Sequence, residues 1–243
     1  ADQFTRLRDG DPLWHENTLT EEEQSLIEGL NLSQIIELNS GIDHMQDDVF
    51  TTYARKGGTD ADDLIIADVD KSLLIGGDGN DILVGSNGAA GDQLEGGNGN
   101  DHLYGSDGGD TLYGGEGDDS LHGEGGNDIL NGGAGNDFLT GDDDDDILDG
   151  GAGNDVLVGG NNNDTYKFSE GQDVVLGFNR WTDVLDFSNF DSIKTLQDLT
   201  LTQFDQGLLI TDTIGNTMWI DDLTSTDYVD FRFDETEADI DIA

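Results

Sequence analysis

The apolar residues in the central part of the chain recur with a period of nine. Each of ten copies has one leucine, or in the last copy a tyrosine, two residues after an aspartate, and the residues on either side of it vary. Successive side chains of a strand point to opposite faces, so this pattern predicts three-residue strands with only the middle side chain inward. The inward residues are Leu83, Leu94, Leu103, Leu112, Leu121, Leu130, Leu139, Leu148, Leu157 and Tyr166.

A six-residue turn precedes each predicted strand, and the whole repeat reads Gly-Gly-x-Gly-x-Asp-x-apolar-x. Complete copies start at Gly76, Gly96, Gly132 and Gly150. Glycine suits a backbone with positive φ, and Asp144 and Asn162, which replace the fourth-position glycine in two copies, also tolerate that conformation. The sixth position is always aspartate: Asp81, Asp92, Asp101, Asp110, Asp119, Asp128, Asp137, Asp146, Asp155 and Asp164.

Two consecutive repeats are predicted to make one coil. The copies that start at positions 76, 96, 114, 132 and 150 all begin Gly-Gly, whereas the intervening copies mostly do not. This alternation indicates a coil of about 18 residues with two opposite edges. The predicted fold is therefore all-β. It is a parallel β-roll, a β-helix solenoid with about 18 residues per coil, with a short α-helical N-terminal segment and a β-rich C-terminal cap.

Stacking of the coils predicts calcium sites along both edges. Each aspartate would lie above another at about 4.8 Å, the spacing of neighbouring strands. Ca²⁺ takes six to eight oxygen ligands and tolerates irregular geometry, whereas Mg²⁺ requires a tighter octahedron. Four gaps on each edge predict roughly eight calcium ions. The insertion Ala90-Gly91 before Asp92 is expected to bulge one turn and weaken the first site of its edge.

The charge balance also indicates cation binding. The 243 residues carry a formal net charge of −46, and no Lys or Arg occurs between Lys71 and Lys167. Only 34% of the residues are hydrophobic, which with this charge is typical of disordered chains, but the periodic leucines argue against disorder. The acidic array should repel itself without cations, and nucleic acid and anionic membranes are poor partners for it.

Composition excludes several other classes of protein. The absence of cysteine excludes disulfides and thiolate metal sites, and no apolar run reaches the length of a transmembrane helix. No N-terminal signal peptide is recognised, and the start at Ala1 is interpreted as a cut within a longer protein.

The repeat resembles that of the repeats-in-toxin (RTX) family. In that family, the carbonyls of positions 2 and 4 and the position-6 carboxylate of one turn hold a calcium ion. The next turn on the same edge adds the carbonyls of positions 1 and 3 and its own position-6 carboxylate. The resemblance implies one site made by Gly77, Gly79 and Asp81 with Gly96, Asn98 and Asp101. Besides the ten aspartates, the implied ligand candidates are Gly76, Gly77, Asp78, Gly79, Ser86, Gly88, Gly96, Gly97, Asn98, Gly99, Gly105, Ser106, Asp107, Gly108, Gly114, Gly115, Glu116, Gly117, Gly123, Glu124, Gly125, Gly126, Gly132, Gly133, Ala134, Gly135, Gly141, Asp142, Asp143, Asp144, Gly150, Ala152, Gly159 and Asn161.

The five consecutive aspartates 142–146 have two interpretations. In the repeat register Asp146 is the position-6 ligand, while the other four could form a solvated acidic loop that only adds negative potential. An EF-hand is excluded, since this segment has no glycine at the sixth and no glutamate at the twelfth loop position.

The flanking segments predict three further regions. Residues 1–56, through the stretch Gln3–Asn17 with its Leu-Arg-Asp-Gly-Asp core, resemble the C-terminal end of an animal-type haem peroxidase domain, and they are expected to be helical. Residues 57–75 are read as a degenerate repeat, Gly57–Ile65, followed by a strand at 73–75 beneath the first complete repeat. Residues 168–243 resemble the cap of an RTX roll and a type I secretion region.

The peroxidase resemblance does not imply an enzyme in this chain. The family's haem-ligating and distal histidines lie upstream of the matching stretch, so no haem and no catalytic residue are expected, although the parent protein would be peroxidase-like. The match departs at Pro12-Leu13, and His15 corresponds to no catalytic position. His102 and His122 are expected to be outward strand residues rather than catalytic groups.

The sequence therefore predicts a calcium-triggered folding and type I secretion module of a large secreted protein. The expected location is extracellular, after secretion by a Gram-negative bacterium, with calcium ions and the type I secretion machinery as partners. The alternative is an adhesin-like module that binds a carbohydrate or another surface. A stripe of outward aromatic residues would favour it, but only Tyr104 and Tyr113, on opposite faces, and the more distant Phe138 occupy outward positions.

Overall fold

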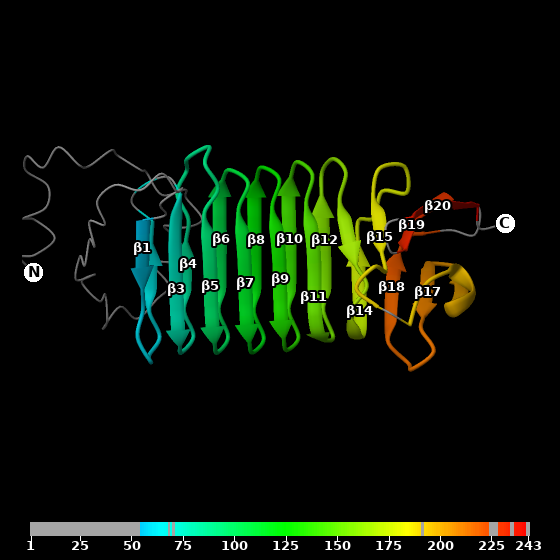
Figure 1. Ribbon diagram of the computed structural model, residues 1–243, viewed down its shortest axis with the longest axis horizontal. Helices are drawn as coiled ribbons and strands as arrows, with labels where there is room; N and C mark the ends of the chain where they lie inside the picture. The colour runs from blue at the N-terminus through cyan, green and yellow to red at the C-terminus, as the bar shows by residue number, and fades with distance from the viewer. Residues whose placement is uncertain are drawn as a thin grey trace, which may run out of the picture. The chain divides into compact units, whose positions relative to one another are not determined.

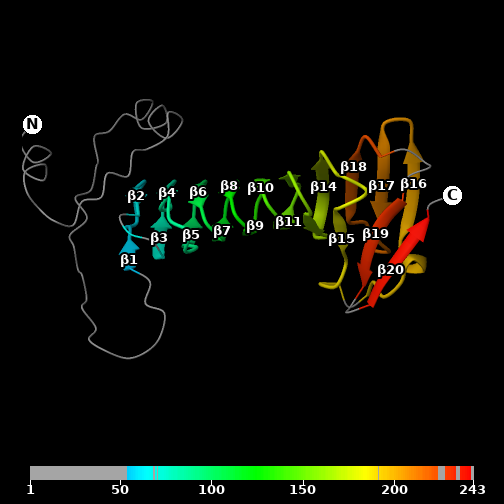
Figure 2. The same ribbon diagram turned by 90° about the horizontal axis from the view of Figure 1, so that it is seen from above.

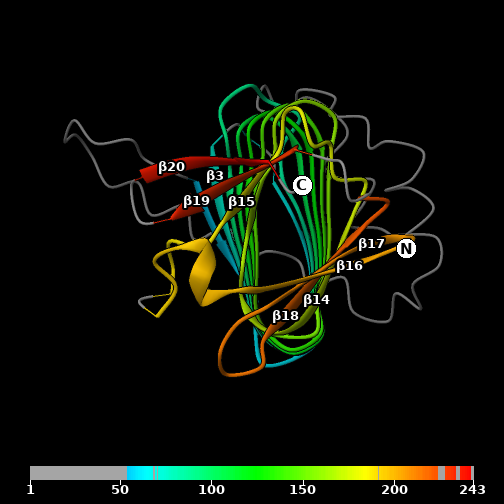
Figure 3. The same ribbon diagram turned by 90° about the vertical axis from the view of Figure 1, so that its right-hand side faces the viewer.

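The computed structural model describes residues 54–67, 69, 71–190, 192–223, 228–233 and 236–241. Two parallel sheets face each other in this part of the chain, and the backbone passes from one to the other at each turn (Figures 1 and 3). The first sheet contains β1 (Ala54–Gly57), β3 (Ser72–Asp78), β5 (Gln93–Asn98), β7 (Thr111–Glu116), β9 (Ile129–Ala134), β11 (Ile147–Gly153), β13 (Thr165–Lys167) and β15 (Val184–Asp186). The second contains β2 (Leu64–Ile66), β4 (Ile82–Val84), β6 (His102–Asp107), β8 (Ser120–Gly125), β10 (Phe138–Asp143), β12 (Val156–Gly160) and β14 (Glu170–Leu176).

The pairing register confirms the parallel β-roll and its coil of about 18 residues. Leu112 pairs with Leu94 on one side and with Leu130 on the other, and Leu139 pairs with Leu121 in the same way. The coil is longer across the turn that holds Ala90-Gly91, where Leu83 pairs with Leu103. The inserted residues therefore enlarge this one turn and leave the strands in register on both sides of it.

The leucine ladder forms the core, as predicted. All nine ladder leucines and Tyr166 are completely buried between the two sheets. Beyond the last coil, the core becomes aromatic: the rings of Phe168 and Phe187 lie 5.1 Å apart, and Phe187 stacks on Phe231 at 5.8 Å. These large side chains cover the apolar end that the last coil would otherwise expose.

Antiparallel strands close the C-terminal end of the roll (Figure 2). They are β16 (Thr200–Phe204), β17 (Gly207–Thr211), β18 (Thr217–Asp221), β19 (Tyr228–Phe233) and β20 (Thr236–Asp241), with the short 3₁₀ helix η1 (Leu196–Asp198) before them. Strand β18 extends the second sheet from β14, and β19 extends the first sheet from β15. The prediction of strands and turns after residue 168 is thus confirmed.

The N-terminal end of the roll differs from the prediction in two details. The degenerate repeat starts at Gly58 rather than Gly57, because Ile65 is the buried residue of β2 and pairs with Leu83. The strand around Leu74 pairs with β1 and β5 in the first sheet, not with β4 of the first complete repeat. The predicted helices lie outside the described residues, apart from residues 54–56, which belong to β1.

Candidate calcium-binding turns

The position-6 aspartates form two continuous rows, one on each edge of the roll. The first-edge row contains Asp63, Asp81, Asp101, Asp119, Asp137, Asp155 and Asp173. The second-edge row contains Asp92, Asp110, Asp128, Asp146, Asp164 and Asp183. All of these side chains are buried, although they lie in turns at the edges of the molecule.

One carboxylate oxygen of each aspartate ties two coils together. The backbone N–H of Asp101 donates to Oδ1 of Asp119 at 2.7 Å, and the N–H of Asp119 donates to Oδ1 of Asp137 at 2.8 Å. The same bond recurs along both rows, always from the N–H of one coil to the carboxylate of the following coil. Each aspartate therefore holds the backbone of the coil before it, which a sequence motif cannot show.

The second carboxylate oxygen is buried and has no hydrogen-bond donor among the described residues in most of the turns. These oxygens are Oδ2 of Asp81, Asp101, Asp110, Asp119, Asp128, Asp137, Asp146, Asp155 and Asp164. A buried polar atom without a partner is costly, and in a native protein it indicates an ion or another group that completes it. The nine oxygens fit a hard cation, because a carboxylate oxygen is the ligand that Ca²⁺ prefers.

Protein donors satisfy this oxygen at the ends of the rows. Ser86 donates to Oδ2 of Asp92 through both its N–H (2.6 Å) and its hydroxyl (2.9 Å). The hydroxyl of Ser169 donates to Oδ2 of Asp173 at 2.8 Å. At the end of the second edge, the N–H of Asn179 donates to Oδ2 of Asp183 at 2.7 Å. Most of the oxygens without donors therefore lie in the interior of the array, and the exception is Oδ1 of Asp63 at the N-terminal end of the first-edge row.

Backbone carbonyls converge on the unpaired oxygens. A Cβ atom placed on Gly132 would lie 2.6 Å from the carbonyl oxygen of Gly150 in the next coil and even closer to Oδ2 of Asp137. Gly96 has the same relation to Asp101 and to the carbonyl of the following coil. The first-position glycine thus keeps a space open in which a carboxylate and a carbonyl of adjacent coils meet.

The turn backbone takes the left-handed conformation at positions 2 and 4. The prediction for position 4 is confirmed, since φ is 82° at Asp144 and 77° at Asn162. Position 2 also requires positive φ, and on the second edge it is filled by Ser106, Glu124 and Asp142 rather than by glycine, which the sequence analysis did not anticipate. The enlarged turn 85–92 departs from this pattern, in line with its extra hydrogen bonds from Ser86.

Burial raises the pKa of eight of the row aspartates far above the ordinary value of 3.8. The pKa rises to about 8 at Asp110 and Asp146, to about 7 at Asp81, Asp119, Asp128 and Asp173, and to about 6 at Asp137 and Asp164. The hydrogen bond from the preceding coil lowers each pKa in part, while neighbouring carboxylates raise it further. Without a cation, these sites would therefore take up protons near neutral pH.

The five aspartates of the segment 142–146 have two different environments, as the repeat register indicates. Asp146 is buried in the second-edge row, whereas residues 142–145 are exposed. The side chain of Asp143 accepts a hydrogen bond from Asn161, and that of Asp78 accepts one from Asn98, both on the outer surface of the turns. These position-3 side chains point away from the unpaired oxygens, so only their backbone carbonyls could serve as ligands.

The fifth position of the repeat carries a second ladder that the sequence analysis missed. The backbone N–H of Asn100 donates to the side-chain oxygen of Asn80 at 2.8 Å, and the N–H of Asn154 donates to that of Asn136 at 3.1 Å. Asn or Asp fills this position in eight of the ten copies. That preference was visible in the sequence and would have identified the ladder.

The rows also include three aspartates that were not predicted: Asp63, Asp173 and Asp183. Each one precedes the inward residue of a strand by two positions, as in Asp173-Val-Val175 and Asp183-Val-Leu185. Their turns keep at most one glycine at the repeat positions, Gly58 before Asp63 and Gly171 before Asp173, and this hid them. No group of three or more His, Asp or Glu side chains converges in the described residues, so a cation here would depend largely on backbone carbonyls.

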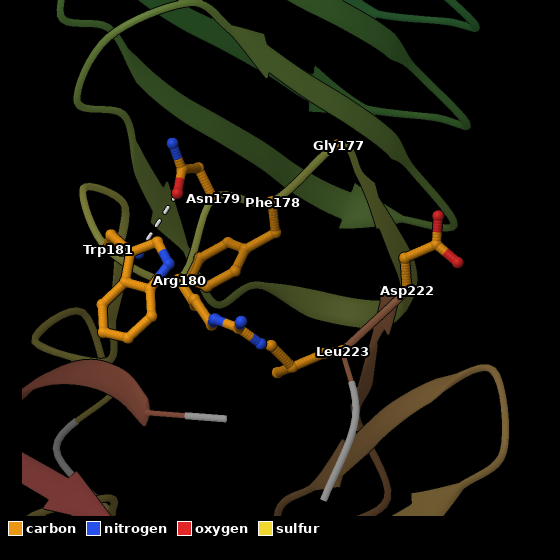
Figure 4. Close-up of a pocket in the computed structure, with 7 residues that line it drawn as sticks. All are labelled: Gly177, Phe178, Asn179, Arg180, Trp181, Asp222 and Leu223. Atoms are coloured by element: carbon orange, nitrogen blue, oxygen red, sulfur yellow. Dashed lines mark hydrogen bonds between the residues drawn. The ribbon is translucent and has the colours of Figure 1, made fainter. Parts of the chain in front are cut away.

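A shallow pocket lies beyond the last second-edge turn (Figure 4). Phe178, Arg180, Trp181 and Leu223 contribute to its lining, and the Arg180 guanidinium lies 5.0 Å from the centre of the Trp181 ring. Trp181 is 74% exposed. No helix of the described residues is long and apolar enough to cross a membrane.

Comparison with known proteins identifies the repeat. The model of the RTX calcium-binding nonapeptide repeat matches four times, at residues 57–90, 88–121, 104–139 and 140–175. A stretch of 55 residues is 47% identical to Dual oxidase 1 of Caenorhabditis elegans, covering 20% of this chain and only 4% of that protein. The fold, the buried carboxylate rows and the four matches lead to one conclusion: the central part of this chain is an RTX β-roll built from calcium-binding nonapeptide repeats.

Proposed function

We propose that the chain is a calcium-triggered folding module of a secreted protein, and that it has no catalytic activity of its own. The nine buried Oδ2 atoms without donors support this proposal most directly. Their position between stacked coils means that a bound cation would complete the contacts between one coil and the next.

Each calcium ion would be held by two consecutive turns of one edge. A representative set is the carbonyls of Gly77 and Gly79 with the carboxylate of Asp81, joined by the next turn through Gly96, Asn98 and Asp101. Asn98 and Gly96 would contribute carbonyl oxygens, of which that of Asn98 also accepts the N–H of Gly79 at 2.8 Å. Ca²⁺ supplies the positive charge that allows the carboxylates to remain ionised inside the turns.

The unpaired oxygens set limits on the number of ions. Among the nine Oδ2 atoms, one ion between each consecutive pair gives four on the first edge and three on the second, and one ion for each of these atoms gives nine. The proposed number of roughly eight ions falls between these limits. The donors at the row ends, such as Ser86 and Ser169, would stop the array at the positions where they bind.

Calcium concentration would control when the module folds. Extracellular calcium modules typically bind at about 10⁻⁴–10⁻³ M, so the array would stay unfolded in the cytosol and fold outside the cell. Binding free energy then becomes folding free energy, because the sites do not exist in the unfolded chain. An unfolded acidic chain suits export through a channel, which supports the proposed type I secretion from a Gram-negative bacterium.

The identity of the parent protein is a separate proposal. The Leu-Arg-Asp-Gly-Asp segment and the partial identity to a dual oxidase support a peroxidase-like domain upstream of Ala1. This chain would contribute no haem ligand to that domain, and the encoding gene upstream of Ala1 would reveal whether the histidines are present.

Circular dichroism in the far ultraviolet tests the folding proposal. The spectrum of the chain in chelator should be that of a largely disordered protein, and millimolar calcium should convert it to a β-rich spectrum in one cooperative transition. Magnesium at the same concentration should have little effect, because it demands a tighter octahedron of ligands. A β-rich spectrum that does not change with chelator would refute the calcium switch.

A further inference from the structure

On the outward face of the second sheet, the residues directly before and after each inward residue of β6, β8, β10, β12 and β14 include no Asp, Glu, Lys or Arg. We call this surface the neutral face. Its outward residues are His102, Tyr104, Ser120, His122, Phe138, Thr140, Val156, Val158, Val174 and Leu176. The same positions of the first sheet include Glu95, Asp149, Lys167 and Asp186. In a chain with 55 acidic residues, a run of uncharged positions over five strands is typical of a surface that contacts a partner, although Glu124 and Asp142 lie farther along the same strands.

Aromatic rings gather at one end of this neutral face. Tyr104 stacks on His122 with ring centres 4.9 Å apart, and His122 lies 6.0 Å from Phe138, which is 40% exposed. The sequence placed Tyr104 and Phe138 far apart, but the coil brings them to one face with His122 between them.

A second aromatic group continues the neutral face beyond β14. Trp219 of β18 pairs with Val174, and Phe204, which is 49% exposed, lies 5.6 Å from its ring. A Cβ on Gly207 would lie 2.5 Å from Cζ2 of Trp219, so the indole lies against the backbone of that glycine. The indole is thus held between Gly207 and the Phe204 ring and remains half-buried.

The dimensions of the neutral face exclude a standard protein interface. With β18 included, six strands at about 4.8 Å and three residues at about 3.3 Å give a strip of roughly 29 by 10 Å, or about 290 Å². A stable protein–protein interface needs about 800 Å² on each partner. A long, narrow strip instead fits an extended polymer ligand. Its repeating units would be similar in length to the spacing between neighbouring coils, about 4.8 Å.

The exposed carboxylates along both edges of the strip favour an uncharged polymer as the ligand. The turns on both sides carry exposed carboxylates such as Asp118 and Asp145, which would repel an anionic polymer. A cationic polymer would bind those turns rather than the face between them. A neutral polysaccharide has neither problem, since its C–H surfaces pack on aromatic and aliphatic side chains and it carries no charge that the carboxylates would repel.

We infer that the neutral face of the second sheet binds a linear, uncharged polysaccharide. Trp219 and Phe138 would provide the packing surfaces, and the valines between them a flat aliphatic floor. This inference rests on the proposed function, because the face exists only in the folded roll.

Binding to insoluble glycans tests the inference. The full chain in millimolar calcium is mixed with cellulose, β-1,3-glucan and β-mannan, and with polygalacturonate as the carboxylated comparison. At least one neutral glycan should retain the protein, and Phe138→Ser and Trp219→Ala should each weaken retention at least tenfold. Ile129→Ser is the matched control, because Ile129 occupies the same strand position on the first sheet and is 43% exposed.

Several outcomes would overturn the inference. They are retention by none of the neutral glycans, stronger retention by polygalacturonate, or an equal loss in the Ile129→Ser control. A calcium-dependent dimer that Phe138→Ser disrupts, seen by analytical ultracentrifugation, would show that a second copy occupies the face instead. Circular dichroism of each sample separates these results from a failure of the proposed function, which would appear as no calcium-dependent folding before any glycan is added.

Discussion

The two oxygens of a row aspartate have different roles, and substitutions can separate them. In Asp137, Oδ1 accepts the N–H of Asp119 in the preceding coil, while Oδ2 has no donor. In Asp92, Oδ2 is already bonded to Ser86. Loss of the carboxylate should therefore weaken calcium binding strongly at Asp137 and only slightly at Asp92.

Calorimetric titration of Asp137→Ala and Asp92→Ala tests this difference. Asp137→Ala should weaken two calcium sites, because its carboxylate lies between them, whereas Asp92→Ala should weaken at most one. Asp137→Asn serves as a control, since an amide oxygen can still accept the N–H of Asp119 while the charge is removed. Equal losses in the two alanine variants would contradict the assigned register.

The first-position glycine should be required for the space and not only for flexibility. Gly132→Ala would place a methyl group between Oδ2 of Asp137 and the carbonyl of Gly150, whereas the Cβ of Gly125→Ala would meet only the Asp107 side chain at 3.7 Å. Overpacking of this kind costs about 1–3 kcal/mol. The midpoint of calcium-induced folding, followed by circular dichroism, should rise several-fold in Gly132→Ala and stay unchanged in Gly125→Ala. Similar midpoints for both variants would argue against a cation next to Gly132.

At the scale of one coil, protons can partly replace calcium. The pKa of eight row aspartates, among them Asp137, Asp81 and Asp146, is raised from 3.8 to about 6–8 in the folded roll. A group with a raised pKa in the folded state stabilises that state at low pH. The contribution is fully present below the unfolded pKa and is lost as the pH rises through the folded pKa.

The calcium-free chain should therefore gain β structure on acidification. Between pH 8 and pH 5, the carboxylates of residues such as Asp110 and Asp146 become protonated inside the turns, which removes their mutual repulsion. Circular dichroism of the calcium-depleted protein at several pH values would measure this gain, and the spectrum in saturating calcium should change little over the same range. Loss of β structure on acidification would show that the carboxylates are not buried in the calcium-free state.

The sequence predicts the elements best where the repeat is regular. One leucine in each copy defined the inward residue, and the structure buries every one. The register of the degenerate repeat was wrong by one residue because Gly57 and Gly58 are equivalent in the sequence, and only the burial of Ile65 distinguishes them. Asp173 was missed because Phe168 and Ser169 replace the first two glycines of its turn, although Gly171 remains at position 4 and the carboxylate occupies the same place in the row.

At the scale of the whole molecule, the C-terminal strands should control the stability of the array. Residues 168–243 cover the last coil with Phe168, Phe187 and Phe231, all nearly fully buried. Deleting these residues would expose Tyr166 and the end of the leucine ladder, and the last coil would lose one of its two neighbours.

We expect the shortened chain, residues 1–167, to need more calcium for folding or to fail to fold. Calcium titration of both chains by circular dichroism measures the shift. An unchanged midpoint would show that the calcium-bound coils stabilise their own end. The pairing of β14 with β18 and of β15 with β19 could not be predicted, because these strands carry no repeat and their partners depend on the shape of the last coil.

In each turn, the backbone N–H of one coil donates to the carboxylate of the following coil. The two ends of the stack should therefore respond differently to force. Force applied at the N-terminal end reaches the first described coil before the others, and among the described residues that coil pairs with a single neighbouring coil. Each detached coil releases a segment that spans roughly 60 Å when extended, and leaves the next coil in the same situation. Force applied at the C-terminal end must first separate the stacked phenylalanines. A motor that draws the folded chain through a narrow pore should therefore unfold it in nearly equal steps when it starts from the N-terminal end, and with one larger first step when it starts from the C-terminal end.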